Sequence, residues 1–239
     1  MDFKSRRKGI RMNFSLLIAS KGRAHNLKNL VNNIFDTATR PEEVEILFLV
    51  EERDPESYAV LSAIDHPRII VKVINSEEMN SNFSNVLLPL ARRSIFMVAA
   101  DDLKFNTIGW DQVVEDKINS YSDGIVLITP NDGVRKGEIA THFFVTKRWV
   151  DAMGYITPPH FTAEYADTWM THVAQRLDRF VYLPLLNIEH LHHSVGKSEY
   201  DATYQEKDGR SHIDKLIWEK FGEEGVSADV EKLKKVIER

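Results

Sequence analysis

The sequence feature that most constrains the fold is an apolar run followed by two adjacent acids. Residues 95–100 are all apolar, which is typical of a strand buried on both faces of a sheet. Asp101 and Asp102 follow where that strand is expected to end. Adjacent carboxylates repel each other and are costly near a core unless a cation neutralises them. The pair is therefore either a solvated turn or a site for a divalent metal that carries a phosphorylated ligand.

Composition limits the class of protein. The chain has 239 residues, of which 43% are hydrophobic and 28% charged, as in an ordinary globular protein with one large domain or two small ones. A net charge of -5 gives no bulk-charge signal for nucleic acid. The absence of cysteine excludes disulfides, zinc–thiolate sites and cysteine nucleophiles.

The chain divides into three expected parts. Residues 1–12 are rich in lysine and arginine and are interpreted as a basic tail, with Met12 as an alternative start. The apolar run at 14–19 is too short for a membrane span or a signal sequence, so we expect a soluble, cytoplasmic protein. Residues 13–205 are predicted to form one domain, and residues 206–239 a C-terminal helical appendage packed on it.

Strand and helix patterns alternate through the first hundred residues. Apolar runs predict strands that are separated by helical patterns, with strands at 14–20, 44–50, 69–74 and from 95, and helices at 27–35, 55–64 and 80–93. This alternation predicts an α/β fold with a mostly parallel central sheet flanked by helices. Ligands of such sheets bind at the carboxyl ends of the strands. Three polar clusters fall at such ends, at 20–23, 51–54 and 101–102.

The second half alternates less regularly. We expect helices at 110–118, at 147–153 with Gly154 as its C-cap, and from Asp167 onward, and strands at 125–129, 142–146, 180–183 and 187–191. The C-terminal part predicts two helices, at 213–221 and 227–239, with Ser227 capping the second.

Histidines form a second candidate cluster. His190 and His192 are two residues apart, so on a strand both would point to the same face. Imidazole nitrogens together with Asp102 would make a mixed oxygen and nitrogen site that suits Mn²⁺, or alternatively Mg²⁺. The alternative is that these histidines only form hydrogen bonds within the structure.

Two acids farther along the chain are candidates for proton transfer. Glu164 and Asp167 lie at a predicted turn into a helix, and either is a candidate general base. Trp169 beside Asp167 is a candidate for stacking on a sugar, although a tryptophan in a helix is often simply core. Arg23 is a candidate for bidentate phosphate binding, and its alternative is a solvated arginine.

The order of these motifs resembles that of nucleotide-sugar glycosyltransferases of the GT-A fold, specifically the family-2-like members. The matching stretches are 14–23, 47–54 and 97–102, and the resemblance extends over residues 14–195. Where that family usually has Asp-x-Asp, this chain has Ala100, Asp101 and Asp102. The stretch 188–193 with Gly196 and Lys197 also resembles small glycosyltransferase-like proteins of phage and bacterial genomes.

The resemblance implies a metal-dependent transfer of a sugar from a nucleotide-sugar donor, preferably UDP-linked, to an unidentified acceptor. In this interpretation Asp102, His190 and His192 hold the metal, and Asp167, with Glu164 as the alternative, is the base of an inverting reaction. Donor-binding candidates are Ser20, Arg23, Glu51, Glu52, Asp54, Asn80, Asp101 and Trp169.

Two other functions remain open. A nucleotidyltransferase shares the open α/β layout, but residues 20–23 contain fewer glycines than its first loop usually does. A glycosyltransferase-like module that binds nucleotide sugars with little catalysis is the alternative outside enzymes. The local motifs of P-loop, dinucleotide-binding and zinc-protease sites are absent from the sequence.

Overall fold

The computed structural model describes residues 12–75 and 82–238. Its first half alternates strands and helices in the order β1 (Phe14–Ser20), α1 (Ala24–Thr37), η1 (Pro41–Glu43), β2 (Val44–Glu51), α2 (Pro55–Ser62), β3 (Ile69–Ile74), α3 (Phe83–Leu87), η3 (Leu88–Leu90) and β4 (Ile95–Ala100). The second half contains β5 (Leu103–Phe105), α4 (Trp110–Ile118), β6 (Leu127–Asn131), β7 (Phe143–Thr146), α5 (Lys147–Met153), α6 (Ala166–Arg176), β8 (Phe180–His190), η4 (His193–Val195) and α7 (Ala202–Ile237).

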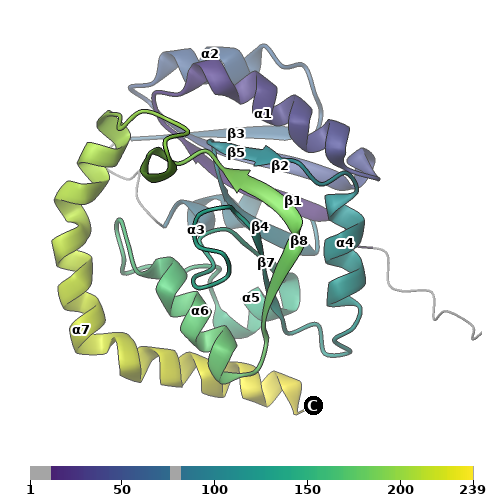
Figure 1. Ribbon diagram of the computed structural model, residues 1–239, viewed down its shortest axis with the longest axis vertical. Coiled ribbons are helices and arrows are strands. Elements are labelled where there is room, and N and C mark those ends of the chain that lie inside the picture. Colours follow the sequence, from purple (N-terminus) through teal and green to yellow (C-terminus); the bar gives the residue numbers. More distant parts are fainter. Residues whose placement is uncertain (1–11, 76–81, 239) are drawn as a thin grey trace, which may run out of the picture.

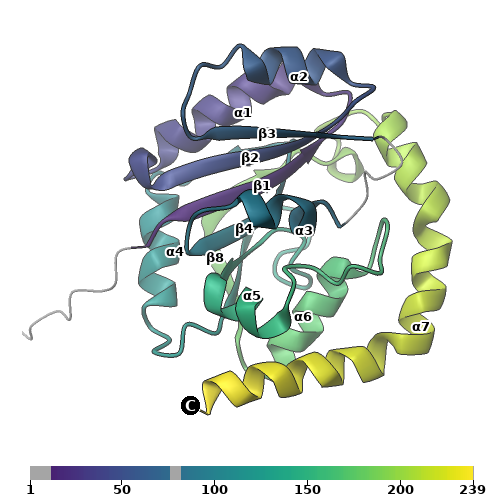
Figure 2. The ribbon, with the colours of Figure 1, turned by 180° about the vertical axis from the view of Figure 1, so that it is seen from behind.

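The strands form one eight-stranded mixed sheet in the order β3-β2-β1-β4-β7-β6-β8-β5. The first four strands in this order are parallel, as the sequence predicts, and they lie side by side in Figure 2. Beyond them, β7 is antiparallel to β4 and β6, while β8 is parallel to β6 and antiparallel to β5. The expected α/β fold class is confirmed, and the antiparallel pairs lie in the half where the sequence alternates less regularly.

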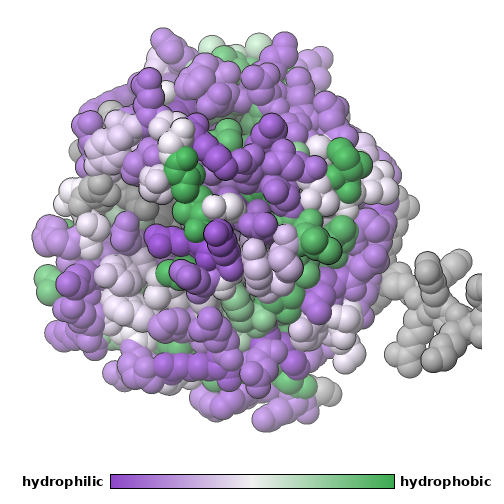
Figure 3. All heavy atoms as spheres, viewed as in Figure 1, coloured by the Kyte–Doolittle hydropathy of each residue, from purple (hydrophilic) through white to green (hydrophobic). Residues whose placement is uncertain are grey.

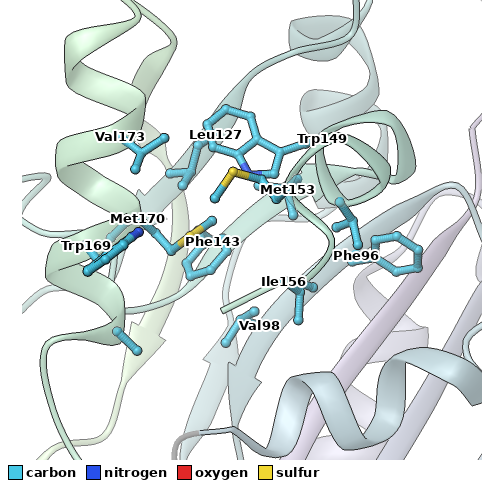
Figure 4. Packing of buried hydrophobic residues seen from close by; sticks show 14 of the residues in the cluster. Phe96, Val98, Leu127, Phe143, Trp149, Met153, Ile156, Trp169, Met170 and Val173 are labelled. Atoms are coloured by element: carbon cyan, nitrogen blue, oxygen red, sulfur yellow. The ribbon is translucent and has the colours of Figure 1, made fainter. Parts of the chain in front are cut away.

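Each face of the sheet has its own hydrophobic core, because neighbouring residues of a strand point to opposite faces. In β1, Leu16 and Ile18 pack in the cluster that includes α1 and α4, whereas Leu17 packs in the cluster that includes α5, α6 and α7. Figure 4 shows part of the second cluster, where Met170 and Met153 of the helices lie near Phe143 of the sheet. The buried strands therefore separate two helical layers.

Helix α7 wraps around the molecule. Figure 1 shows that it runs along one side of the structure, then turns and continues beneath α5 and α6 to its C-terminal end. The sequence predicts two helices here, which is wrong: Ser227 does not cap a second helix but donates its hydroxyl to the Glu223 carbonyl inside α7. Val226, Val230 and Leu233 belong to the core. Helix α7 therefore packs on the rest of the chain and begins at Ala202, before the expected start of the C-terminal appendage at residue 206. The division into domains stays a prediction.

Two further expectations about the second half differ from the structure. The predicted strands at 180–183 and 187–191 are one strand, β8, whose pairing with β6 is interrupted by a bulge at Pro130 and Asn131. The three-residue strand β5 is too short to be recognised from its pattern. Gly154 does end α5 in the left-handed conformation, as predicted.

Figure 3 shows a largely hydrophilic face with small, separate hydrophobic patches. Within residues 12–75 and 82–238, no helix is both long enough and apolar enough to cross a bilayer. Asn80 and the start of the helix expected at 80–93 lie outside the described residues.

Candidate active site

The carboxyl ends of β1, β2 and β4 bring their polar loops together, as the sequence predicts. Lys21 forms an ion pair with the buried Glu51, with 2.9 Å between Nζ and Oε1. The Gly22 amide donates to Asp54 Oδ2 at 2.7 Å, and Asp54 also caps α2 by accepting from the Ser57 amide at 3.1 Å. The loops after β1 and β2 therefore hold each other in place. Ser20 is buried at the end of β1, and Glu52 is exposed in the turn after β2.

Arg23 forms ion pairs with both aspartates of the pair and offsets part of their charge. Its Nη1 donates to Asp101 Oδ1 at 2.8 Å and to Asp102 Oδ2 at 2.9 Å, and its Nε donates to Asp201 Oδ2 at 2.9 Å. Only 9% of Arg23 is exposed, and each of the paired aspartates is 5% exposed. Arg23 is therefore not the solvated arginine of the sequence alternative, since its Nη1 and Nε contact three carboxylates. Phosphate binding by Arg23 stays a prediction.

The pKa values of the two aspartates are shifted in opposite directions. Burial raises the pKa of Asp101 to about 6, and the charge of Asp102 adds to this rise while Arg23 opposes it. Burial also acts to raise the pKa of Asp102, but its contacts with His190 and Arg23 outweigh burial and hold that pKa well below the ordinary value. Asp102 is therefore the member of the pair that keeps its charge to lower pH.

The first turn of α7 covers this cluster. The Tyr204 hydroxyl donates to Asp102 Oδ2 at 2.9 Å, and the Arg23 guanidinium carbon lies 4.9 Å from the centre of the Tyr204 ring. Asp201 caps the helix by accepting from the Tyr204 amide at 3.2 Å. Burial, followed by the charge of Asp102, raises the pKa of Tyr204 to about 12. Sequence reasoning missed both residues, because Tyr204 lies about a hundred positions from Asp102 and Asp201 lies still farther from its partner Arg23.

His190 connects the aspartate pair to the rest of the site. It ends β8 opposite Leu103, the first residue of β5, and its Nε2 lies 3.2 Å from Asp102 Oδ1. That oxygen forms no hydrogen bond of good geometry within the described residues. The ring of His192 is centred 4.8 Å from that of His190, and its Nδ1 contacts the Ser194 hydroxyl at 2.8 Å. The two rings are neighbours, but His192 lies beyond the end of β8, at the N-cap of η4, so the two histidines do not lie on one strand as the sequence predicts.

The donor set is compatible with a divalent metal but does not form a complete ligand group. Asp102 Oδ1 offers a carboxylate oxygen and His190 Nε2 an imidazole nitrogen in contact with it, which is the mixed chemistry that Mn²⁺ accepts. Among the described residues, no three His, Asp or Glu side chains are grouped as a metal site requires. Metal ligation by Asp102, His190 and His192 therefore stays a prediction.

A pocket of about 560 Å³ lies beside this connection, on the face of the sheet that α6 covers. Its apolar wall includes Val98 of β4 and Phe143 of β7. Its polar wall combines cationic, anionic and hydroxyl groups, contributed by Arg135, Glu164, Asp167, Thr168, His190, His192 and Ser194. Four residues predicted separately from sequence, the two acids and the two histidines, therefore line a single pocket.

The residues around α6 divide between this pocket and the core. Glu164 and Asp167 are half-buried on the pocket side, where Asp167 Oδ1 accepts from the Thr168 amide at 2.7 Å. The prediction that Trp169 stacks on a sugar is wrong, because its side chain is in the core with 3% exposure. Its indole Nε1 donates to Asp229 of α7 at 2.9 Å. Arg135 and Ser194 were missed, since Arg135 lies in a loop and Ser194 in the short helix η4, and neither belongs to a recognisable motif.

Comparison with known proteins identifies the fold class. No protein-family model matches the sequence, and no curated protein matches it. Among solved structures, the chain is similar to the mannosyltransferase PcManGT from Pyrobaculum calidifontis in complex with GDP-Man and Mn²⁺, with a TM-score of 0.60 over 76% of this chain and 10% identity. It is also similar to S. aureus TarS 1–349 in complex with UDP, with a TM-score of 0.56 over 75% of this chain and 15% identity.

These alignments cover 57% of the mannosyltransferase chain and 59% of the TarS chain, so this protein corresponds to less than two thirds of either. The likeness defines the architecture: the chain has the GT-A-type glycosyltransferase fold, as the order of its motifs predicts.

Proposed function

We propose that this protein is a family-2-like glycosyltransferase that transfers a sugar from a nucleotide-sugar donor to an acceptor. The observation that carries the proposal is the contact between Asp102 and His190, which joins the charged strand ends to the pocket. A donor bound with its diphosphate at the strand ends would direct its sugar toward the pocket. The structural neighbours were solved with GDP-Man and with UDP, which supports a donor of this class.

The strand ends would bind the nucleotide part of the donor. Glu51, Glu52 or Asp54, at the end of β2, would hold the base or the ribose, with a UDP-linked donor as the first expectation. Ser20 and Asp101 lie at the ends of β1 and β4, where the diphosphate is expected. Arg23 would lessen the repulsion between the aspartate pair and this diphosphate, since its single positive charge offsets part of their negative charge.

Asp102 and His190, with His192 as a third ligand, would hold Mn²⁺ or Mg²⁺. Such an ion supplies charge stabilisation for the leaving diphosphate when it is bound. The protein's own part is to present the charged Asp102 beside the imidazole.

The pocket would receive the acceptor. Asp167, with Glu164 as the alternative, would accept the proton of the attacking hydroxyl, which leads to inversion at the sugar carbon. Both acids line the pocket together with His190. A base on this wall would face a sugar held by groups at the strand ends.

A thermal-shift panel tests the proposal. We would heat the protein with nucleoside mono-, di- and triphosphates and with nucleotide sugars, each with and without Mn²⁺. A ligand that binds only the folded state raises the melting temperature, by an amount equivalent to about 2.7 kcal/mol at a hundred times its dissociation constant. We expect one nucleoside diphosphate and its sugar to stabilise the protein, and more so with Mn²⁺.

The same panel distinguishes the alternatives. Stabilisation by triphosphates alone would favour a nucleotidyltransferase. Binding of a nucleotide sugar without slow Mn²⁺-dependent hydrolysis would favour a binding module. If no nucleotide or nucleotide sugar shifts the melting temperature, the proposed function is wrong.

A further inference from the structure

A fully buried carboxylate of α7 holds the loop that precedes α6. Asp214 is 0% exposed, and its two oxygens accept from three consecutive backbone amides. The Thr162 amide lies 3.0 Å from both oxygens, and the amides of Ala163 and Glu164 lie 2.6 and 2.8 Å from Oδ2. The Thr162 hydroxyl adds a contact of 3.2 Å to Oδ1. We call this arrangement the Asp214 clasp.

The clasp satisfies groups that would otherwise be expensive to bury. A carboxylate removed from water is tolerated only when hydrogen bonds replace its hydration, and a peptide N–H likewise needs an acceptor. Hydrogen bonds to an ionised acceptor are roughly twice as strong as neutral ones. The amides of 162–164 therefore have one well-defined arrangement while Asp214 stays in place.

The clasped segment continues directly into the pocket wall. Ala163 and Glu164 line the pocket, and so do the next residues through Thr168. Tyr165 has a φ of 66°, a left-handed conformation that is uncommon for a residue with a side chain, and α6 begins immediately after it. Fixing the amides of 162–164 thus sets the point at which α6 starts and the position from which Glu164 and Asp167 face the pocket.

We infer that Asp214 is a positioning residue for the proposed transfer, which holds the wall bearing Glu164 and Asp167 at the geometry that the acceptor requires. Asp214 is not among the residues that line the pocket, so it acts through the loop and not on the substrate. This inference rests on the proposed function. A displacement of about 1 Å in a catalytic group lowers rates by about 100-fold, so a modest shift of the wall would be measurable.

The test compares Asp214→Asn with Asp229→Asn. Asp229 is a second buried acid of α7, 2% exposed, which accepts hydrogen bonds from Trp169, Tyr155 and Lys232, all outside the pocket. Both variants lose a buried charge from the same helix, so they control for a loss of stability. We would measure kcat, the acceptor KM, the donor Kd and amide hydrogen exchange of residues 160–168, well below both melting temperatures.

For Asp214→Asn we expect kcat to fall by about 10- to 100-fold, the donor Kd to change by less than about twofold, and exchange at 162–164 to quicken by about tenfold. For Asp229→Asn we expect kcat within about twofold of the wild type and unchanged exchange at 162–164. Equal losses of kcat in the two variants, or unchanged exchange in Asp214→Asn, would overturn the inference.

If Asp214→Asn does not fold, Thr162→Val tests the positioning role of Asp214 instead. It removes only the hydroxyl contact to Asp214, and we expect about twofold faster exchange at 163–164 with a similar loss in kcat. Wild-type behaviour of this variant would then overturn the inference. If the wild-type protein itself transfers no sugar from any donor, the proposed function fails separately, and the exchange measurements alone decide whether Asp214 holds the wall.

Discussion

The charged strand ends and the pocket are adjacent but organised in opposite ways. At the strand ends, Arg23, Asp101 and Asp102 are almost completely buried and paired with one another. In the pocket, Glu164 and Asp167 are half-buried beside about 560 Å³ of open space. The comparison indicates that the charges at the strand ends are already paired with one another before any ligand binds. The acids of the pocket, by contrast, remain accessible to a ligand.

The largest expected effect is on the rate of sugar transfer, and it comes from a substitution in the pocket. Asp167→Asn keeps the size of the side chain but removes the proposed base, so we expect transfer to fall by about 10²- to 10⁴-fold while nucleotide-sugar binding is retained. Initial rates and isothermal titration would measure the two quantities. Asp178→Asn, an exposed acid just beyond α6, is the matched control with expected wild-type rates. Survival of transfer in Asp167→Asn would assign the base elsewhere, with Glu164 as the next candidate.

The next largest effect is on nucleotide binding, and it comes from a substitution at the strand ends. Asp102→Ala removes the acceptor shared by Arg23, Tyr204 and His190, and we expect Mn²⁺-dependent nucleotide binding to weaken by more than about 100-fold. Titration of a nucleoside diphosphate with and without Mn²⁺ would measure the loss. Asp151→Ala, which breaks an exposed ion pair with Lys147, should bind normally. Binding by Asp102→Ala at the wild-type level would exclude Asp102 as a metal ligand.

A smaller effect is expected where α7 covers the aspartates. Tyr204→Phe removes a hydrogen bond to a charged acceptor, so we expect the free energy of unfolding to fall by about 2 kcal/mol. Urea denaturation followed by tryptophan fluorescence would measure the change. Tyr200→Phe, in an exposed neighbouring side chain, is the control with an expected change below about 0.5 kcal/mol. Equal stability of the two variants would show that the covering turn contributes little to the buried pair.

The last expected effect, similar in size to that of Tyr204→Phe, is a dependence of the free energy of unfolding on pH. Folding raises the pKa of Asp101 from 3.8 to about 6, so the folded state binds more protons than the unfolded state between these values. The contribution of Asp101 therefore makes the free energy of unfolding fall as pH rises from about 4 to about 6, by roughly 1 kcal/mol per pH unit at most. Asp102 acts in the opposite sense, because its lowered pKa gives a stabilisation that is lost as pH falls below about 4.

Urea denaturation between pH 4 and 7 would measure this slope, with Asp101→Asn as the comparison. The variant cannot titrate at this position, so its stability should fall less between pH 4 and 6 than that of the wild type. Identical slopes in the two proteins would show that Asp101 does not hold its proton more strongly when folded.

The parallel half of the fold was predictable from sequence because three of its four strands are buried on both faces. Continuous apolar runs mark β1, β2 and β4, and helical spacing marks α1. The antiparallel half was harder, because β5 has only three residues and β8 continues through Pro184 in the middle of its pattern. The single helix α7 was missed because glycines at 222 and 225 resemble a break between two helices.

The candidate site was predictable where residues adjacent in sequence share a loop or a strand end. Asp101 with Asp102 and His190 with His192 are pairs of this kind, and each occurs near the expected place. The partners supplied by α7 were not predictable, since nothing near Asp201, Tyr204 or Asp214 in sequence shows which loop each will contact. For Trp169, helical spacing did not show which side of α6 would face the core.

The contact between α6 and α7 also has an evolutionary consequence. A Cβ added to Gly225 would lie 1.9 Å from Cη2 of Trp169, so position 225 accepts a side chain only if the indole is lost or the helices separate. In relatives that keep this packing, the two positions should therefore vary together, with glycine opposite tryptophan and a larger residue opposite a smaller one. Such a pair would help to recognise distant relatives of this chain, whose structural neighbours share only 10% and 15% of its residues.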